Sequence, residues 1–358
     1  MSAFWPVAIA LISVLENTYR ISLSANMAIN STFRTLACTL ACAAFWVDTS
    51  HAATDCALKQ IASIPAEVTP DNTLEVSVRI NDVPAKIRID TGGAVSVLNK
   101  KFAERIGMPI ETMASTVYGL TGRALNEMTR VNSLQMGNSV SRNADFALMP
   151  VGGDGTDGEP VGLFGTDYLQ NYDVEFDFAG GKMNLFAPEH CVDQVVYWAP
   201  EFFKSKIRYQ QDGILHTPLI SVSVDGKNML GLIDTGATAN IMRMASAEGR
   251  LDLTMGGPDT PKVGSTTGVE GVKLEVYEHV FQTLTFGDLT LRNTKMEIIP
   301  INSAAHVAKL GSHIKQGTID DPDVLIGMSF LKKLRLYVSY SENAIYYTIA
   351  PPKQAASP

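Results

Sequence analysis

The sequence predicts an all-β protein assembled from two copies of one domain. Segments in which apolar and polar residues alternate, the pattern of half-buried strands, recur through most of the chain. Glycine (28 residues) and proline (17 residues) are frequent enough to form the turns that such strands need. The tripeptide Asp-Thr-Gly follows a strand hairpin at Asp90 and again at Asp234, and the segments after it also recur.

Length and composition limit the classes of protein to which the chain can belong. The chain has 358 residues, of which 46% are hydrophobic and 18% are charged, the balance of a globular protein with a large core. Its formal net charge is −8, and it has no cluster of lysine and arginine residues. Because non-specific nucleic-acid binding depends on basic patches, the composition argues against a nucleic-acid partner.

The N-terminal segment resembles a secretory signal. Residues 3–15 are apolar but too few to span a bilayer as a helix. From Met27, a basic residue precedes the apolar segment 35–47, and small residues follow at 50–52. We therefore expect Met27 to be the true start, residues 1–53 to be a removed signal region, and the mature protein to be periplasmic or secreted without a membrane span. The alternative is an uncleaved anchor made of both apolar stretches.

The four cysteines agree with export. Cys38 and Cys42 lie inside the apolar part of the signal, whereas Cys56 and Cys191 remain in the mature chain. Two cysteines in an exported protein suggest one disulfide bond, Cys56 to Cys191. The alternative is a pair of free, buried thiols.

The first copy of the repeat begins with a hairpin. Residues 74–80 alternate between apolar and polar, residues 81–82 are turn formers, and residues 85–89 alternate again. This second strand leads directly into Asp90, so the aspartate is expected at the end of a half-buried strand.

The second copy is built in the same way. Residues 219–224 form a strand, Asp225-Gly226 is a strong hairpin turn, and residues 229–233 lead into Asp234. The two aspartates are 234 − 90 = 144 residues apart, which is the size of a domain rather than of a stacking repeat.

Later elements recur in the same order in both copies. The matching pairs are Thr121-Gly122 and Thr267-Gly268, residues 134–138 and 284–288, residues 163–169 and 325–331, and the closing strands 173–178 and 335–340. We therefore expect an N-terminal lobe at 54–186, a proline-containing linker at 187–210, a C-terminal lobe at 211–350 and a tail at 351–358. The second copy is longer, and we place much of the surplus at about 302–321. Two lobes in one chain predict a monomer.

Two facing Asp-Thr-Gly loops would bring two carboxyl groups together. Like charges about 3 Å apart cannot both ionise, so one carboxyl keeps a proton while the other stays a base. Such a pair can activate water for attack on a peptide bond by general acid–base catalysis. Asp90 and Asp234 are therefore the candidate catalytic residues.

The residues beside each aspartate suit the same arrangement. Thr91 and Thr235 can hydrogen-bond across to the opposite loop and hold the carboxyls together. Gly92 and Gly236 let each backbone approach the opposite carboxyl, since neither has a Cβ atom. One Asp-Thr-Gly alone would be a weak signal because aspartate and glycine both favour turns. Two copies in matching contexts are far more specific.

These motifs resemble the retropepsin-like and pepsin-like aspartic proteases. Residues 87–98, Ile-Arg-Ile-Asp-Thr-Gly-Gly-Ala-Val-Ser-Val-Leu, are similar to the active-site strand of that family, and residues 161–165 and 324–327 are similar to its second conserved element. The resemblance covers about residues 70–350. It is strongest to bacterial retropepsin-like proteases, here fused as two lobes as in pepsin.

The resemblance implies the acid protease fold, with two pseudo-symmetric, closed, barrel-like lobes and a cleft between them. It also implies an endopeptidase that acts on a peptide or protein without a cofactor. Two other functions stay open: a peptide-binding protein of the cell envelope that has lost catalysis, and a structural envelope protein. The intact pair of aspartates argues against both.

The sequence departs from the pepsin pattern in several places. Pepsin-type sites carry Ser or Thr after Asp-Thr-Gly, whereas this chain has Gly93 and Ala237. Fewer hydrogen bonds to the ionised pair should raise its pKa, so we expect activity at weakly rather than strongly acidic pH. The first copy predicts a helix with Asn99 as its cap. The second predicts a poorer helix at 243–249 and has Ser329 where the first has Asp167.

Two glycine-containing hairpins are candidate flaps over the cleft. Pepsin has one such hairpin and a retropepsin dimer has two. The residues concerned are Tyr118, Gly119, Thr121 and Gly122 in the first copy and Thr266, Thr267 and Gly268 in the second. Mobile tips of this kind could close on a substrate and exclude water. The alternative is a pair of plain surface hairpins.

No metal or cofactor site is predicted. His306 and His313 are seven residues apart, which is not a ligand pair by itself, and the chain lacks His-Glu-x-x-His and Cys-x-x-Cys. The glycine-rich run 151–160 lacks the lysine of a phosphate-binding loop and misses the spacing of a calcium loop. We expect it to be a surface loop.

Overall fold

Strands dominate the part of the chain that the structure describes. The computed structural model describes residues 57–118, 124–208, 216–268, 271–301, 307–309 and 321–350. All of them belong to one compact unit, Ala52–Pro358. The expected signal region, its alternative as an anchor, Cys56, the two histidines at 306 and 313, and the C-terminal tail lie outside the described residues.

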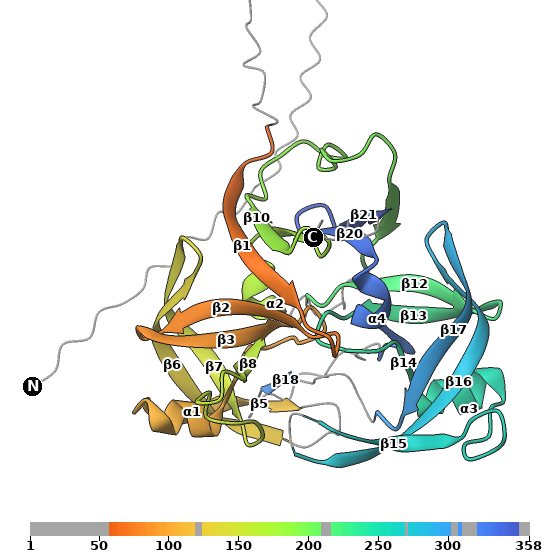
Figure 1. The fold of residues 1–358 in the computed structure, drawn as a ribbon, viewed down its shortest axis with the longest axis horizontal. Coiled ribbons are helices and arrows are strands. Elements are labelled where there is room, and N and C mark those ends of the chain that lie inside the picture. The colour runs from red at the N-terminus through yellow and green to blue at the C-terminus, as the bar shows by residue number, and fades with distance from the viewer. Residues whose placement is uncertain are drawn as a thin grey trace, which may run out of the picture. The chain divides into compact units, whose positions relative to one another are not determined.

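The first lobe is a closed barrel (Figure 1). Its strands, in order around the barrel, are β2 (Leu74–Ile80), β3 (Val83–Ile89), β8 (Pro160–Phe164), β4 (Val97–Asn99), β7 (Ser139–Met149) and β6 (Ala124–Met136). Pairing of β2 with β6 closes the ring. A further strand, β5 (Glu111–Tyr118), pairs with β6 as a hairpin.

The second lobe repeats this strand order. Its barrel consists of β12 (Leu219–Val224), β13 (Lys227–Ile233), β19 (Val324–Ile326), β14 (Ile241–Arg243), β17 (Leu289–Ile299) and β16 (Lys273–Phe286). Here β12 pairs with β16 to close the ring, and β15 (Lys262–Thr267) forms the hairpin with β16. The predicted all-β fold of two pseudo-symmetric barrels is confirmed.

The alternating pattern of the sequence determines which side chains enter each barrel. In β2, Val76, Val78 and Ile80 are buried while Ser77 and Arg79 between them are exposed. Burying one such aliphatic side chain stabilises a fold by about 1.5–3 kcal/mol. A register slip of one residue would expose the whole apolar set, so the pattern fixes the pairing.

An antiparallel layer, continuous with the first lobe through the pairing of β1 with β2, joins the two lobes (Figure 1). Its strands are β1 (Gln60–Val68), β10 (Lys182–Phe186), β9 (Asp173–Asp177), β20 (Leu334–Ser339), β21 (Ala344–Ile349) and β11 (Phe203–Lys206). The closing strands of the two copies, β9 and β20, meet in the middle of this layer, with Val174 opposite Val338. Strand β11 lies in the segment 187–210 that we expected to be only a linker.

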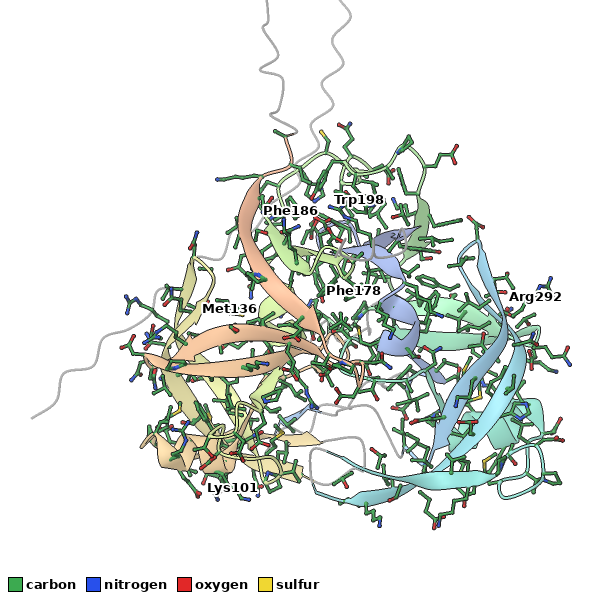
Figure 2. The ribbon with its side chains drawn as sticks, in the orientation of Figure 1. Lys101, Met136, Phe178, Phe186, Trp198 and Arg292 are labelled. Atoms are coloured by element: carbon green, nitrogen blue, oxygen red, sulfur yellow. The ribbon has the colours of Figure 1, made fainter. Side chains whose placement is uncertain are left out.

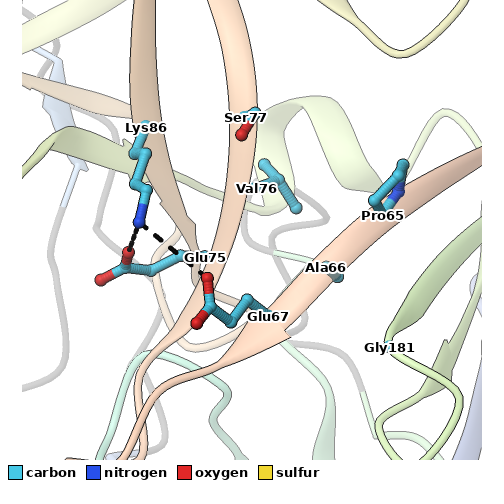
Figure 3. Close-up of a pocket in the computed structure, with 8 residues that line it drawn as sticks. All are labelled: Pro65, Ala66, Glu67, Glu75, Val76, Ser77, Lys86 and Gly181. Atoms are coloured by element: carbon cyan, nitrogen blue, oxygen red, sulfur yellow. Dashed lines mark hydrogen bonds and ion pairs between the residues drawn. The ribbon is translucent and has the colours of Figure 1, made fainter. Parts of the chain in front are cut away.

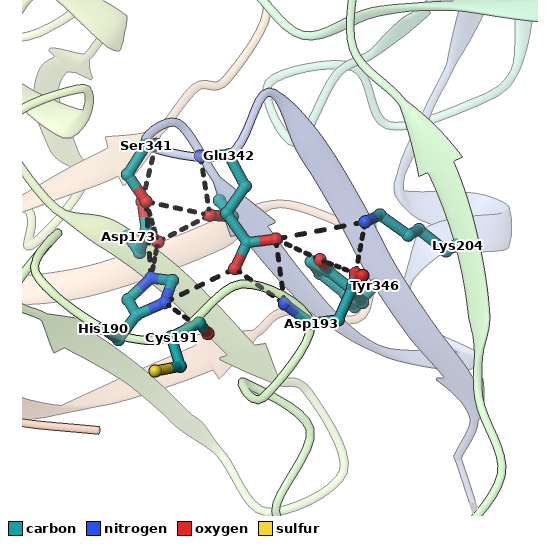
Figure 4. A network of polar contacts seen from close by, with 9 residues as sticks. Asp173, His190, Cys191, Asp193, Lys204, Ser341, Glu342 and Tyr346 are labelled. Carbon is teal, nitrogen blue, oxygen red and sulfur yellow. Dashed lines mark hydrogen bonds and ion pairs between the residues drawn. The ribbon is translucent and has the colours of Figure 1, made fainter. Parts of the chain in front are cut away.

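Aromatic side chains and a polar network consolidate this joining layer. Phe186 of β10, labelled in Figure 2, packs against Tyr337 of β20 with ring centroids 5.5 Å apart. Beside them, His190 Nε2 lies 2.6 Å from an oxygen of Asp173, and His190 Nδ1 lies 3.4 Å from Glu342 (Figure 4). Because Asp173 belongs to the first copy and Glu342 to the second, this histidine links the two lobes.

Four short helices complete the described fold. They are α1 (Lys100–Arg105), α2 (Thr166–Leu169), α3 (Met244–Leu251) and α4 (Met328–Leu331). Among the described residues, none is long and apolar enough to cross a membrane. The expected weaker helix of the second copy is in fact the longer one, with eight residues against six in α1.

The cap predicted for α1 is also different. Asn99 occupies the N-cap position, but its side chain makes no hydrogen bond to the helix. Its amide instead donates to the carbonyl oxygens of Gly153 and Pro160, at 3.0 and 3.3 Å. The side chain therefore ties the glycine-rich loop to the helix rather than capping the helix.

One strand crosses between the lobes. The short strand β18 (Val307–Lys309) lies in the surplus segment of the second copy but pairs antiparallel with β5 of the first lobe, with Val307 opposite Val117. The insertion that lengthens the second copy thus reaches the hairpin of the other lobe.

Candidate active site

Parallel strand pairs place both aspartates at equivalent positions. In the first lobe β3 runs parallel to β8, and the backbone N–H of Asp90 donates to the carbonyl of Phe164 at 3.0 Å. In the second lobe β13 runs parallel to β19, and the N–H of Asp234 donates to the carbonyl of Ile326 at 3.0 Å. The apolar-apolar-Gly elements singled out in the sequence therefore run directly alongside the Asp-Thr-Gly loops.

The two loops are joined by hydrogen bonds between their threonines. The N–H of Thr91 donates to Oγ1 of Thr235 at 3.0 Å, and the N–H of Thr235 donates to Oγ1 of Thr91 at 3.1 Å. Each hydroxyl in turn donates to a carbonyl of the other lobe, Thr91 to Ile233 at 2.7 Å and Thr235 to Ile89 at 2.8 Å. All four contacts are buried, so their loss would leave unpaired polar groups.

The glycines after the threonines make the close approach possible. A Cβ atom added at Gly92 would lie 2.5 Å from Cγ of Asp234, and one added at Gly236 would lie 2.4 Å from Cγ of Asp90. Side chains at either position would collide with the opposite carboxyl. Each lobe thus packs its own backbone against the carboxyl of the other lobe.

Backbone N–H groups hold both carboxyls. Oδ1 of Asp90 accepts from the N–H of Gly93 at 2.8 Å. Oδ1 of Asp234 accepts from the N–H groups of Gly236 and Ala237, at 2.9 and 3.1 Å. These bonds fix the orientation of the two carboxyls without any side-chain hydroxyl.

The two carboxyls also interact with each other. Burial raises the pKa of Asp90, and it raises the pKa of Asp234 well above its usual range, with the charge of Asp90 adding to the effect. Such a pair retains one proton where two separate carboxylic acids would both be ionised.

A second ring of polar side chains supports each loop. In the first lobe, Ser96 donates from its N–H and Oγ to the carboxylate of Asp167, at 3.0 and 2.7 Å, and accepts from the N–H of Gly165 at 2.8 Å. Burial raises the pKa of Asp167 to about 6. From the sequence, Asp167 was noted only because Ser329 stands at the equivalent position of the second copy, and Ser96 was not singled out.

The second lobe makes two of these three contacts with different residues. Asn240 donates from its N–H to Oγ of Ser329 at 3.2 Å, and its Oδ1 accepts from the N–H of Gly327 at 3.0 Å. The change from Asp167 to Ser329 is therefore matched by the change from Ser96 to Asn240. Comparing the two copies position by position would have revealed this pairing.

A cavity of about 500 Å³ contains both aspartates. Equivalent apolar residues of the two lobes form its walls, among them Val97, Met149 and Leu163 of the first lobe and Ile241, Ile299 and Leu325 of the second. Residues 151–153, expected in a surface loop, also line it. A cavity of this size with two convergent carboxyls fits an extended segment of a substrate better than a small ion.

The second candidate flap lies over this cavity. Thr266, Thr267 and Gly268 line it together with both aspartates. At the far side of the hairpin turn, a Cβ atom added at Gly271 would lie 3.1 Å from Val151 of the first lobe. The second hairpin therefore extends across the cavity to the other lobe.

The first candidate flap is described only at its base. Gly119, Thr121 and Gly122 lie outside the described residues, and the backbone of Tyr118 pairs with Ala124 where the hairpin begins. Val117 and Leu125, one step nearer the barrel, line the cavity. The position of this tip over the cavity stays a prediction.

Two further expectations concern cysteines and metals. Cys191 takes part in a disulfide bond, and its expected partner Cys56 lies outside the described residues, so the pairing stays a prediction. Among the residues that the structure describes, no three histidine, cysteine, aspartate or glutamate side chains are grouped closely enough to hold a metal ion.

A family model described as "Aspartyl protease" matches residues 76–168 and again residues 220–330, once in each lobe. Among solved structures, the chain is similar to the aspartic proteinase from Irpex lacteus, with 13% sequence identity, coverage of 82% of this chain and 98% of that chain, and a TM-score of 0.44. No curated protein sequence matches the chain.

Proposed function

Because this chain belongs to the aspartyl protease family, we propose that it is an endopeptidase in which Asp90 and Asp234 activate a water molecule. The family model matches more than half of the chain. The observation that carries the proposal is the approach of the two carboxyls, each against the glycine of the opposite loop. Asp234 is buried and Asp90 is half-buried, a setting in which two carboxyls would otherwise be costly.

Because the two carboxyls share one proton, they take different roles: one holds the proton and the other stays ionised as the base. The base accepts a proton from water as the water oxygen attacks the peptide carbonyl carbon, and the acid donates its proton to the carbonyl oxygen. When the tetrahedral intermediate collapses, the proton on the base passes to the leaving nitrogen and the acid recovers its own.

The cavity walls and the second hairpin support a peptide as the substrate. An extended peptide in the cavity would expose its backbone polar groups to the edges of the hairpin strands, a common way for proteins to bind peptides. The hairpin would also exclude water from the carboxyls once a peptide is bound.

The location of the protein is a further part of the proposal. We place the mature enzyme outside the cytoplasm, periplasmic or secreted, because its N-terminal segment resembles a signal and its cysteine count fits one disulfide. N-terminal sequencing of the protein recovered from fractionated cells tests this. A mature N-terminus near residue 54 in the exported fraction supports it, and a cytoplasmic chain that begins at Met1 or Met27 contradicts it.

Digestion of a peptide library, read by mass spectrometry, tests the activity. The proposal expects internal cleavage that a statine-type inhibitor of aspartic proteases blocks and a metal chelator does not. Tight binding of library peptides without cleavage would instead favour the catalytically silent peptide-binding protein. A monomer is expected on size-exclusion chromatography, because both aspartates come from one chain.

A further inference from the structure

A cationic side chain lies in the cavity two residues before one of the aspartates. On β3, Ile87 and Ile89 point into the barrel core and are fully buried. Arg88 lies between them, so its side chain leaves the strand on the opposite face, where it lines the cavity that contains Asp90 and Asp234. It is partly buried there.

A lysine on the same face of β3 is paired with carboxylates of the protein. Lys86, two residues earlier, has its Nζ 3.4 Å from Glu75 and 4.0 Å from Glu67 (Figure 3). These residues line a separate hollow of about 190 Å³ outside the cavity with the aspartates. The positive charge of Lys86 is therefore neutralised within the protein.

Arg88 has no such neutralisation among the described residues. Glu75 lies directly opposite Arg88 in the pairing of β2 with β3, but its carboxylate accepts from Thr73 and Lys86 instead. Nε of Arg88 is buried and has no hydrogen-bond partner. A buried, unpaired guanidinium nitrogen is costly, and a carboxylate that reached it would remove that cost.

The other charges near Arg88 do not pair with it. Exposed Asp71 has its pKa lowered mainly by a hydrogen bond from Thr69, and the charge of Arg88 only adds to this. Across the cavity, the second arginine, Arg243, is already bound to Asp321 at 3.0 Å. Glu297 stands on the wall of the second lobe. The first-lobe side of the cavity is also lined by Asp90 and Glu159, so Arg88 is the one cation among the first-lobe residues that line it.

At the equivalent position the second lobe carries no cation. The position equivalent to Arg88, two residues before the second aspartate, is Leu232, which also lines the cavity. Leu232 packs in an apolar cluster with Val276 and Leu325. Two otherwise matching walls therefore present an arginine on one side of the carboxyl pair and a leucine on the other.

We propose that Arg88 makes the enzyme select substrates with an acidic side chain, aspartate or glutamate, on the first-lobe side of the scissile bond, and an apolar side chain beside Leu232. This inference rests on the proposed peptidase function. A guanidinium binds a carboxylate through two parallel hydrogen bonds, which an amide or an apolar side chain cannot reproduce. Sites that hydrogen-bond a substrate group reject analogues lacking it far more strongly than apolar pockets do.

The test compares matched peptides and matched variants. From a sequence that the library shows to be cut, three peptides are made that differ only at the position beside Arg88, with Glu, Gln or Leu. For the wild type we expect kcat/KM to be at least about tenfold higher with Glu than with Gln. Arg88→Leu should lose this preference and favour the Leu peptide, and Arg88→Lys should keep a reduced preference for Glu.

Arg142→Leu is the control, since Arg142 is exposed on β7 and the change removes the same charge outside the cavity. It should keep the wild-type preference. Equal rates for the Glu and Gln peptides with the wild type, or an unchanged Glu preference in Arg88→Leu, would overturn the inference while leaving the proposed peptidase intact. Cleavage of no library peptide by the wild type would overturn the proposed function itself, and this inference with it. The wild-type comparison does not depend on the folding of any variant.

Discussion

Thr91 and Thr235 exchange backbone hydrogen bonds across the junction of the lobes, each N–H donating to the other's Oγ1 at 3.0 and 3.1 Å. They are 144 residues apart in the sequence, and neither is among the residues that line the cavity with the aspartates. Their contacts hold the two Asp-Thr-Gly loops in register. The distance between the carboxyls therefore depends on these two side chains as well as on the aspartates.

Replacing Thr91 with valine should loosen this junction. Valine keeps the shape of threonine but leaves the carbonyl of Ile233 and the N–H of Thr235 unpaired, at a cost of about 2–4 kcal/mol for two buried groups. Chemical denaturation measures the loss, and peptidase activity should fall with it. Thr91→Ser retains the hydroxyl and serves as the control. Equal stability of the valine and serine variants would contradict the role assigned to these hydrogen bonds.

Adding one methyl group at Gly92 should separate the carboxyls. The new Cβ would lie 2.5 Å from Cγ of Asp234, so the carboxyl must move. A displacement of about 1 Å at a catalytic group lowers kcat on the order of 100-fold. Gly249→Ala in α3 is the control because a Cβ there meets no atom within 4 Å. A Gly92→Ala enzyme with wild-type kcat would show that the close approach is not needed.

The sequence was sufficient for the fold and for the meeting of the two Asp-Thr-Gly loops, because both depend on local patterns that occur twice. Alternation placed Ile87 and Ile89 in the core, and the strand that they form ends at Asp90. It was not sufficient where a side chain chooses between partners. Asn99 is a good helix cap by residue type, yet it bonds to the carbonyl oxygens of Gly153 and Pro160.

Contacts between segments far apart in the sequence could not be predicted either. The strand β11, the link from Asp173 to Glu342 through His190 and the crossing of β18 to the first lobe all join residues far apart in the chain. No periodicity encodes such pairings. The unpaired Arg88 could be recognised only after Glu75 was seen to bind Lys86 instead.

The pH dependence of activity should respond to the residue after Asp-Thr-Gly. Burial and the charge of Asp90 raise the pKa of Asp234, so the wild type should keep its catalytic proton and be active at weakly acidic pH. In Ala237→Ser, a hydroxyl that donates to the ionised carboxylate would lower that pKa. The alkaline limb of the kcat profile should therefore move to lower pH. A wild-type optimum near pH 2, or an unmoved limb in the variant, would contradict this account.

Stability should fall as the pH rises through the titration of His190. Burial alone would lower the pKa of this histidine, but the hydrogen bond that it donates to Asp173 and the charges of Asp173 and Glu342 outweigh it and raise the pKa. A raised histidine pKa means that the stabilisation is complete below about pH 6.5, the unfolded value, and is lost as pH rises through the folded value.

His190→Gln tests this directly. At pH 5 the variant should unfold with a free energy lower by roughly 1–3 kcal/mol, since Asp173 loses a buried, charged partner. The difference should shrink at alkaline pH, where the wild-type histidine is neutral. His279, a half-buried side chain outside this network, provides the control variant His279→Gln. A stability difference that does not change with pH would rule out the proposed titration.

Single replacements of the paired carboxyls test the central claim most directly. Asp90→Asn and Asp234→Asn keep the shape of the site but leave only one titrating carboxyl, so the measurement is kcat/KM of each variant on one peptide that the wild type cleaves. We predict that either change alone lowers kcat/KM by at least about 10²–10⁴-fold, because the base and the acid are each indispensable. Cleavage within a few-fold of the wild-type rate by either variant, with the fold intact, would contradict a mechanism based on Asp90 and Asp234.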